Sequence, residues 1–224
     1  INKSIFFSKI ISGQHFVEFQ TSIKTKKEYF EKKYSFNYDD WFSGNFNIWT
    51  KFLTPLKEIK YLEIGSFEGR SSVFIGELNN VNSITTVDTF GGSDEHKNTD
   101  DMCTTTIVDF NLVYKNCSQN LEKVNILTNL VKDTSDNFFL NNDKKFNVIY
   151  IDGSHFHENV KKDFINSMNC LEKNGILICD DFLWFYYKKI EDNPAGAILE
   201  CYLKYEKDLE VLFINHQIIF RKIN

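Results

Sequence analysis

Four side chains in the second half of the chain have the types and spacing that metal-assisted proton transfer needs. Asp152 ends an apolar run and His155 follows in the next loop, while Asp180 and Asp181 end a second run. If the two runs are neighbouring strands, they lie ~4.8 Å apart and the three carboxylates converge at one edge of a sheet. Clustered carboxylates repel one another unless a cation lies among them, and an all-oxygen set suits Mg²⁺ rather than zinc. His155 is the natural general base for deprotonating a hydroxyl.

A plainer interpretation of the same residues stays open. Asp152 would cap a helix that begins near His157, His155 would be a loop residue, and Asp180 and Asp181 would be solvated. His157 is expected to start that helix or to face solvent, so it is not a candidate for the site.

A second group of candidate residues occupies an earlier strand, turn and helix start. Gly65 allows a sharp turn close to a ligand, and Gly69 allows tight packing at the helix start. Their Gly-x-x-x-Gly spacing argues against a dinucleotide site, and the absence of Gly-Lys-Ser/Thr excludes a P-loop. Glu63 lies inside the strand, where a carboxylate needs donors or a cation. Asp88 ends the next strand, where its carboxylate is suited to accept both hydroxyls of a ribose.

Short apolar runs alternate with amphipathic segments from residue 59 onward, which predicts βαβ units and a mostly parallel sheet. The last two runs are separated only by Asn215, so they must form an antiparallel hairpin. The predicted fold is α/β: a Rossmann-like, doubly wound, seven-stranded, mostly parallel sheet with an antiparallel last strand. The predicted strands cover 59–65, 82–88, 123–129, 146–152, 175–181, 209–214 and 216–222, and the predicted helices cover 71–78, 134–140, 157–171 and 194–205.

The first part of the chain has a different character. Aromatic residues with helix-like spacing predict one or two helices that end just before Pro55 and pack as a cap on the main domain. We therefore expect an N-terminal helical and aromatic cap over residues 1–55, and a cofactor-binding domain over residues 56–224. Trp41 and Trp49 are expected to belong to one lid over the site.

The chain from about residue 57 to 222 resembles the class I S-adenosylmethionine-dependent methyltransferases. The resemblance is carried by Glu63-Ile-Gly65-Ser-Phe-Glu-Gly69, by Asp88, and by Lys132-Asp-Thr-Ser135 after the third strand. It implies that Gly65 and Gly69 contact the methionine part of the cofactor, Asp88 the ribose, and Asp133 the adenine edge. The full set of cofactor-binding residues that it implies is Glu63, Gly65, Ser66, Gly69, Asp88 and Asp133.

A narrower resemblance comes from Tyr150-Ile-Asp-Gly-Ser-His155, followed by Asp163, and from Gly175-Ile-Leu-Ile-Cys-Asp-Asp181. This pattern looks like a subgroup that includes metal-dependent, macrocin-type sugar O-methyltransferases. In that subgroup the acids matching Asp152, Asp180 and Asp181 hold Mg²⁺, and the histidine matching His155 is the base. One departure is Asn174-Gly175 in place of the usual Gly-Gly, and Asn tolerates the left-handed conformation.

Five aromatic residues between Phe182 and Tyr187 follow the second acid pair. They are interpreted either as a pocket wall over a ring or sugar, or as core packing against the cap, and both remain open. The segment between Gly91 and Asn116 is expected to be an insertion near the site, whose acids Asp94, Glu95, Asp100 and Asp101 mostly face solvent.

Composition restricts the partners. The formal net charge is −5, which makes the 224-residue chain a poor electrostatic match for nucleic acid or anionic lipid. No apolar run approaches the roughly 18–20 residues that span a bilayer, and the five dispersed Cys indicate a reduced, cytoplasmic protein. The chain begins with Ile1 rather than Met, which is consistent with a piece of a longer polypeptide.

These observations favour an S-adenosylmethionine-dependent, Mg²⁺-assisted O-methyltransferase that acts on a small hydroxylated acceptor, with a sugar as one candidate. Two alternatives stay open. One is a catalytically inactive relative that serves as a ligand-binding or scaffolding domain, and the other is different chemistry, such as hydroxylation, on a metal-bound small molecule. A homo-oligomer is compatible with the sequence.

Overall fold

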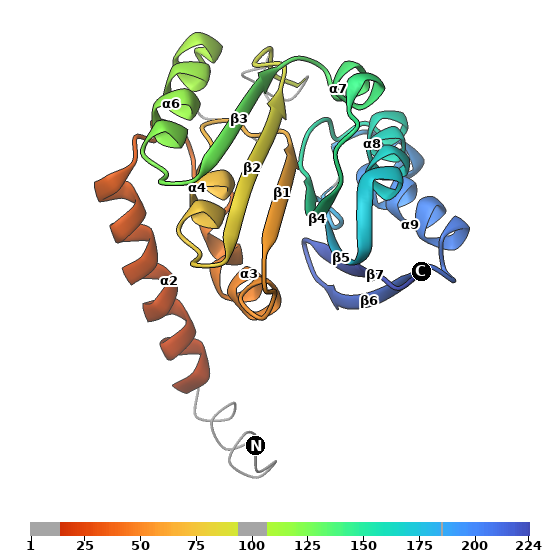
Figure 1. The fold of residues 1–224 in the computed structure, drawn as a ribbon, viewed down its shortest axis with the longest axis horizontal. Coiled ribbons are helices and arrows are strands. Elements are labelled where there is room, and N and C mark those ends of the chain that lie inside the picture. The colour runs from red at the N-terminus through yellow and green to blue at the C-terminus, as the bar shows by residue number, and fades with distance from the viewer. Residues whose placement is uncertain (1–13, 94–106, 185) are drawn as a thin grey trace.

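The computed structural model of this chain describes residues 14–93, 107–184 and 186–224 (Figure 1). Its strands form one seven-stranded sheet in the order β3-β2-β1-β4-β5-β7-β6. Strands β1 to β5 pair in parallel, and β7 pairs antiparallel with both β5 and β6. The predicted fold class is therefore confirmed. The strands are β1 (Ile59–Ile64), β2 (Val81–Asp88), β3 (Leu127–Lys132), β4 (Phe146–Ile151), β5 (Leu171–Cys179), β6 (Leu209–Ile214) and β7 (Ile218–Lys222).

Helices cover both faces of the sheet. One hydrophobic core lies under α2, α3, α4 and α6, and a second lies under α7, α8 and α9 (Figure 1). The helices are α2 (Gln14–Lys33), α3 (Phe46–Leu53), α4 (Arg70–Gly76), α6 (Phe110–Glu122), α7 (Ser135–Asn141), α8 (His157–Cys170) and α9 (Pro194–Lys204), with short 3₁₀ turns η1 (Ser43–Asn45) and η2 (Ile190–Asp192).

Alternation along the central strands determines which core each side chain enters. Along β4, Val148 and Tyr150 face the α2–α3–α4 side, whereas Ile149 and Ile151 face the α8–α9 side. Such period-two alternation with apolar residues on both faces is typical of a parallel strand covered by helices on each side. Because Asp152 continues this strand, it follows Tyr150 onto the α2–α3–α4 side.

The third strand is displaced from its predicted position over 123–129. Helix α6 ends at Glu122 and the strand begins only at Leu127. Val124, between these two elements, is buried. It packs so closely on Gly76 of α4 that a Cβ at Gly76 would clash with it. The apolar run thus belongs partly to a turn whose side chains fill the core, a situation that periodicity does not separate from a strand.

The N-terminal segment, for which one or two helices were predicted, contains α2 and α3, and they pack into the same core as the sheet. Trp49 of α3 is fully buried against Tyr61 and Tyr150, with ring centroids 6.3 and 4.7 Å away. Trp49 is therefore a core residue rather than part of a lid. The acids between Asp94 and Asp101 lie outside the described residues.

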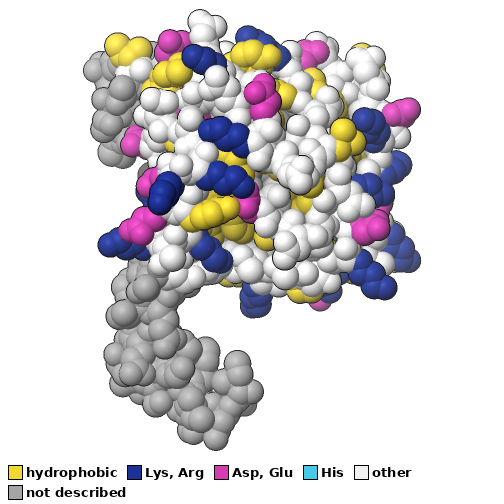
Figure 2. Space-filling view, turned by 60° about the vertical axis from the view of Figure 1, so that its left-hand side comes forward, with side chains coloured by type: hydrophobic (Ala, Val, Ile, Leu, Met, Phe, Trp, Pro, Cys, Tyr) yellow, Lys and Arg dark blue, Asp and Glu magenta, His cyan; other side chains and the backbone are white. Residues whose placement is uncertain are grey.

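On the face shown in Figure 2, lysine, acidic and hydrophobic side chains are interspersed. Of the helices in the described part of the chain, none combines the length and the hydrophobicity that crossing a membrane requires.

Candidate functional site

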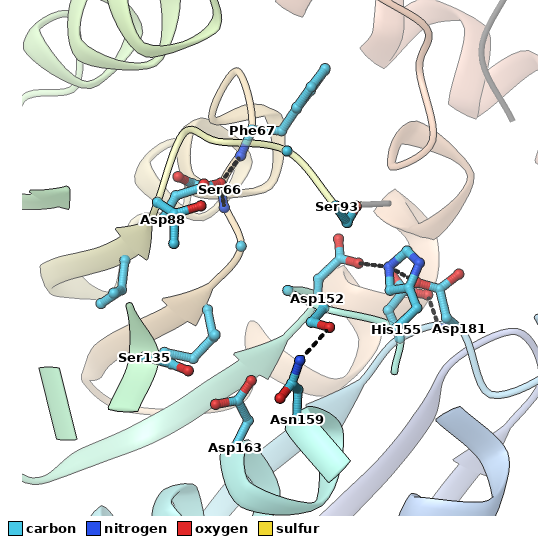
Figure 3. Close-up of a pocket in the computed structure, with 18 of the residues that line it drawn as sticks. Ser66, Phe67, Asp88, Ser93, Ser135, Asp152, His155, Asn159, Asp163 and Asp181 are labelled. Carbon is cyan, nitrogen blue, oxygen red and sulfur yellow. Dashed lines mark hydrogen bonds and ion pairs between the residues drawn. The ribbon is translucent and has the colours of Figure 1, made fainter. Parts of the chain in front are cut away.

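A cavity of about 880 Å³ opens at the carboxyl ends of β1, β2, β4 and β5 (Figure 3). This is where the strand order reverses, with β1 leading to β2 on one side and to β4 on the other, and such reversals are the usual ligand sites of open α/β sheets. Eight of the ten predicted site residues line it: Gly65, Ser66, Asp88, Asp133, Asp152, His155, Asp180 and Asp181. The other two, Glu63 and Gly69, lie behind the loop that forms its wall.

The loop after β1 approaches β4 so closely that it requires glycine. Gly65 has φ +87°, and a Cβ at this position would lie 2.0 Å from the carbonyl oxygen of Asp152. Gly69 has φ +78° and is the residue from which α4 begins. Both glycines thus have backbone conformations that other residues rarely adopt, and Gly65 brings the two halves of the cavity together. Their contact with the methionine part of a cofactor stays a prediction.

Asp88 fixes the shape of this loop. Its Oδ2 accepts hydrogen bonds from the backbone N–H groups of Ser66 and Phe67, each at 2.9 Å (Figure 3). Its Oδ1 accepts from Phe90 N–H at 2.7 Å. Three of the four lone-pair positions of the carboxylate are thus used by backbone donors. The structure places Asp88 at the cavity wall, and its predicted contact with a ribose stays a prediction.

Glu63 supports the loop from below. Its buried carboxyl group accepts hydrogen bonds from the hydroxyls of Ser71 and Ser72, and the Thr86 hydroxyl donates to it over 3.3 Å. Burial raises the pKa of Glu63 to about 7, although these hydroxyl donors act in the opposite direction. Since it does not reach the cavity, its position favours support of the helix α4 start over direct contact with a cofactor.

Two acids lie at the far end of the cavity, one in the turn after β3 and one on α8. Asp133 accepts from Thr134 N–H at 2.7 Å and from the Asn137 side chain at 2.9 Å, and its pKa is lowered mainly by the Asn137 hydrogen bond. Asp163, on α8, is buried and lines the same end, near Ser135 (Figure 3). Burial raises the pKa of Asp163 to about 7, against the effect of a hydrogen bond from Ser135.

At the opposite end, Asp152, His155 and Asp181 meet. His155 Nε2 lies 2.8 Å from a carboxylate oxygen of Asp181 and 3.9 Å from one of Asp152 (Figure 3). One ligand atom from each of the three residues falls within 4.8 Å of the others, a separation that would allow them to share one metal ion. Asp181 reaches this position through a left-handed backbone, with φ +56°. The sequence-based expectation that the acids of β4 and β5 meet a histidine describes this end of the cavity.

Asp180 behaves differently from its neighbour. Its Oδ1 accepts from Asp181 N–H at 2.8 Å, and its Oδ2 accepts from the Gln217 amide at 2.7 Å and from the Tyr150 hydroxyl. Both oxygens are therefore engaged from within the protein, although the residue lines the cavity. Asp180 is therefore less suited to bind a metal ion directly than Asp152, His155 and Asp181 are.

The crowded carboxylates affect each other's titration. Burial and the charge of Asp180 raise the pKa of Asp152 well above its ordinary value. Burial and the charge of Asp181 raise the pKa of Asp180 to about 6. A divalent cation would relieve this repulsion, so the donor set fits such an ion in charge and in the separation of its atoms.

Aromatic rings form the walls of the cavity on two sides. Trp184 lies 4.8 Å from the His155 ring, and Tyr187 lies 6.0 Å from Trp184. On the opposite side, Trp41 lies 5.3 Å from Phe67, and all four of these aromatic residues line the cavity. Of the two interpretations of the aromatic run, a pocket wall describes Trp184 and Tyr187, whereas Phe182 packs against the α8–α9 core.

Sequence reasoning did not identify Tyr150 and Gln217 as part of the site. Tyr150 was within reach, because residues two apart on a strand share a face and Tyr150 precedes Asp152 by two. No sequence pattern marked Gln217 as a site residue, because its contact with Asp180 arises only when the β6–β7 hairpin packs beside β5.

Comparison with known proteins agrees with this geometry. A family model described as a methyltransferase domain matches residues 62–182, more than half of the chain. None of the curated proteins compared with the chain matches it significantly.

Solved structures share the fold at low sequence identity. A proposed caffeoyl-CoA O-methyltransferase from Staphylococcus aureus has a TM-score of 0.59 and 16% identity, over 96% of this chain and 100% of that one. An O-methyltransferase from Bacillus cereus, solved with S-adenosylhomocysteine, has a TM-score of 0.57 and 11% identity, over 92% and 89%. The O-methyltransferase TomG from Streptomyces achromogenes, solved with S-adenosylmethionine, has a TM-score of 0.57 and 8% identity, over the same shares.

The cavity connects a glycine-containing β1 loop to a cluster of acids and a histidine, and the matched segment runs from β1 through this cluster to Phe182. The chain therefore belongs to the methyltransferase domain family, which confirms the predicted enzyme class, an S-adenosylmethionine-dependent methyltransferase.

Proposed function

We propose that this chain transfers the methyl group of S-adenosylmethionine to a hydroxyl oxygen of a small molecule. The observation that carries the proposal is a single cavity that joins the Gly65 loop and Asp88 to the Asp152–His155–Asp181 cluster. A cofactor held by the loop would direct its sulfonium methyl toward the end where a hydroxyl can be deprotonated. O-methyltransferases with the same fold, solved with the cofactor or its product, support this choice.

The cofactor would lie along the carboxyl ends of β1, β2 and β3. The preformed loop around Ser66 and Phe67 would hold the methionine part, Asp88 the ribose, and the turn at Asp133 the adenine edge. Because Asp88 already holds the loop in shape through backbone donors, binding would cost little reorganisation of this wall.

The transfer needs an oxygen nucleophile and an acceptor for its proton. The acceptor oxygen forms a bond to the methyl carbon while the electrons of the S–C bond return to sulfur, which leaves S-adenosylhomocysteine. The hydroxyl proton passes to His155, a general base. The carboxylates of Asp181 and Asp152 lie 2.8 and 3.9 Å from its Nε2, and they stabilise the imidazolium that forms.

A divalent ion, with Mg²⁺ as the candidate, would be held by the carboxylates of Asp152 and Asp181, with Asp180 behind them. His155, the third member of this cluster, is assigned to the proton and not to the ion. When bound, the ion would lower the pKa of the acceptor hydroxyl. The crowding that raises the pKa values of Asp152 and Asp180 supports this assignment.

The lining of the cavity favours an uncharged or cationic acceptor that contains a ring, such as a sugar or a phenol. Among the described lining residues, nine are acidic, and the two permanent cations, Arg70 and Lys162, pair with Asp40 and Asp136 at 3.4 and 3.3 Å. An anionic acceptor would meet net repulsion, whereas the aromatic side chains of Trp41, Phe67, Trp184 and Tyr187 line the space that a neutral ring would occupy.

Calorimetry with S-adenosylhomocysteine tests the cofactor half. The wild-type chain should bind it, and Asp88→Ala should weaken binding at least roughly tenfold, because it removes a carboxylate with several hydrogen bonds. The exposed acid Asp143 provides a matched control, since Asp143→Ala should leave the affinity unchanged. No binding by the wild-type chain at millimolar ligand would reject the proposal.

Measurements of methyl transfer test the metal assignment and the acceptor class. Formation of S-adenosylhomocysteine should be lost on treatment with a chelator and in Asp152→Ala, while the affinity for S-adenosylhomocysteine stays within about threefold. Each neutral ring acceptor should be methylated faster than its own phosphate ester. Full activity in chelator would contradict the metal assignment, and a preference for the phosphate esters would contradict the acceptor class.

A further inference from the structure

A buried chain of hydrogen bonds connects the N-terminal helix α3 to the acidic end of the cavity. The Trp49 indole N–H donates to Gln217 Oε1 at 2.8 Å, and Gln217 Nε2 donates to Asp180 Oδ2 at 2.7 Å. The Tyr150 hydroxyl lies between Asp180 and Asp152, 2.8 Å from an Asp152 oxygen. Trp49, Gln217 and Tyr150 are at most 1% exposed.

The sheet explains why these residues meet. Tyr150 of β4 is paired with Ile178 of β5, and both face the α2–α3–α4 side of the sheet. Two residues further along each strand, Asp152 and Asp180 therefore lie on that same side. The hairpin is tied to this point by the Phe182 N–H, which donates to the His216 carbonyl oxygen at 2.7 Å and so brings Gln217 beside Asp180.

Trp49 determines the donor-to-acceptor direction of this series of hydrogen bonds. An indole N–H can only donate, so it fixes Oε1 of Gln217 as the acceptor and turns Nε2, the donor, toward Asp180. A buried carboxylate that lacked this donor would be costly, and a reversed amide would present an oxygen to it.

The orientation of Gln217 affects the Asp152–His155–Asp181 cluster through Asp180. With Oδ2 held by Gln217 and Tyr150, Oδ1 is left to accept from Asp181 N–H at 2.8 Å. This bond fixes the peptide between Asp180 and Asp181, from which Asp181 continues in a left-handed conformation. That conformation directs the Asp181 carboxylate to His155. We propose that Gln217, oriented by Trp49, is a positioning residue that holds the Asp180–Asp181 turn in the geometry of a divalent-ion site. The inference rests on the proposed function, because it assumes that the cluster binds a cation.

Calorimetric titration with Mn²⁺, together with S-adenosylhomocysteine affinity and thermal unfolding, tests the proposal. Gln217→Leu and Trp49→Phe keep most of the packing and remove the donors, so each should weaken Mn²⁺ binding by roughly tenfold, the usual lower range for outer-shell partners of a metal site. The affinity for S-adenosylhomocysteine should change less than twofold. If Trp49 acts through Gln217, the double variant should bind Mn²⁺ no more weakly than Gln217→Leu alone.

Phe46→Leu is the matched control for loss of packing, because Phe46 is a fully buried aromatic residue of α3 that stacks on Phe74. It should lower the unfolding temperature without changing the Mn²⁺ affinity. Variants at Gln217 and Trp49 that bind Mn²⁺ like the wild type while unfolding at lower temperature would overturn the positioning role alone. A wild-type chain that binds no Mn²⁺ would overturn both this role and the metal part of the proposed function.

Discussion

At the scale of single residues, the site depends on a glycine, Gly65, at a position where any side chain would clash with the end of β4. Gly65 donates its N–H to the Val87 carbonyl oxygen at 2.8 Å while its Cα passes directly over the end of β4. This contact sets the distance between the Gly65 loop and Asp152, the two parts of the cavity to which the proposed function assigns the cofactor and the acceptor. Two features of Gly65 therefore matter together, its positive φ and the space that a Cβ would occupy.

Gly65→Ala should destabilise the fold by about 2 to 4 kcal/mol, the sum of a strained left-handed residue and an overpacked contact. It should also abolish S-adenosylhomocysteine binding, because relief of the clash must move the loop away from β4. Gly44→Ala is the control, since a Cβ at Gly44 meets no atom within 4 Å. Chemical denaturation and calorimetry measure both effects, and a Gly65→Ala chain with wild-type affinity would contradict the account.

At the scale of elements, the sequence predicted what depends on alternation and missed what depends on long-range contacts. The period-two pattern of β4 and β5 was sufficient to place Asp152 and Asp180 on one side of the sheet edge. It was not sufficient for Asp181, which reaches His155 through a left-handed backbone. Nor could it predict the hydrogen bond from Gln217 to Asp180, because Gln217 is in turn held by Trp49, 168 residues earlier in the chain. The β3 start was missed for a similar reason, because a buried turn and a strand have the same apolar pattern.

The linker between α2 and α3 gives a further prediction at this scale. The buried Glu68 accepts from the backbone N–H groups of Asn37 at 2.9 Å and Tyr38 at 3.1 Å, and from the Asn116 amide at 2.7 Å. One side chain of the β1–α4 loop thus joins the N-terminal linker to α6.

Glu68→Ala should leave these donors unsatisfied and cost about 2 to 3 kcal/mol. Hydrogen exchange should show faster exchange at Asn37 and Tyr38 than in the wild type, whereas Asp143→Ala should leave both sites unchanged. Unchanged protection of these two amides would show that the linker is held by other contacts.

At the scale of the whole molecule, the net charge of −5 is less informative than where the acids lie. Two of them, Glu63 and Asp163, are buried on opposite faces of the sheet, and burial raises the pKa of each to about 7. Two others, Asp40 and Glu77, have lowered pKa values because hydrogen bonds and cations favour their charged forms. The two groups affect the pH dependence of folding in opposite directions.

A carboxyl group with a raised pKa stabilises the folded state fully below its unfolded pKa, and this contribution is lost as the pH rises to about 7. A carboxyl group with a lowered pKa contributes above its unfolded pKa and loses that contribution as the pH falls. Stability should therefore be greatest near pH 5 and decrease toward pH 8, by about 2 kcal/mol for each of these two acids. Asp152 and Asp180, whose pKa values are also raised, add to the decrease. Glu63→Gln and Asp163→Asn should each flatten this decrease, because an amide does not titrate, and Asp143→Asn should not. Denaturation at pH 5 and pH 8 measures the difference, and a wild-type chain that is more stable at pH 8 would show that the buried acids are not protonated in the folded state.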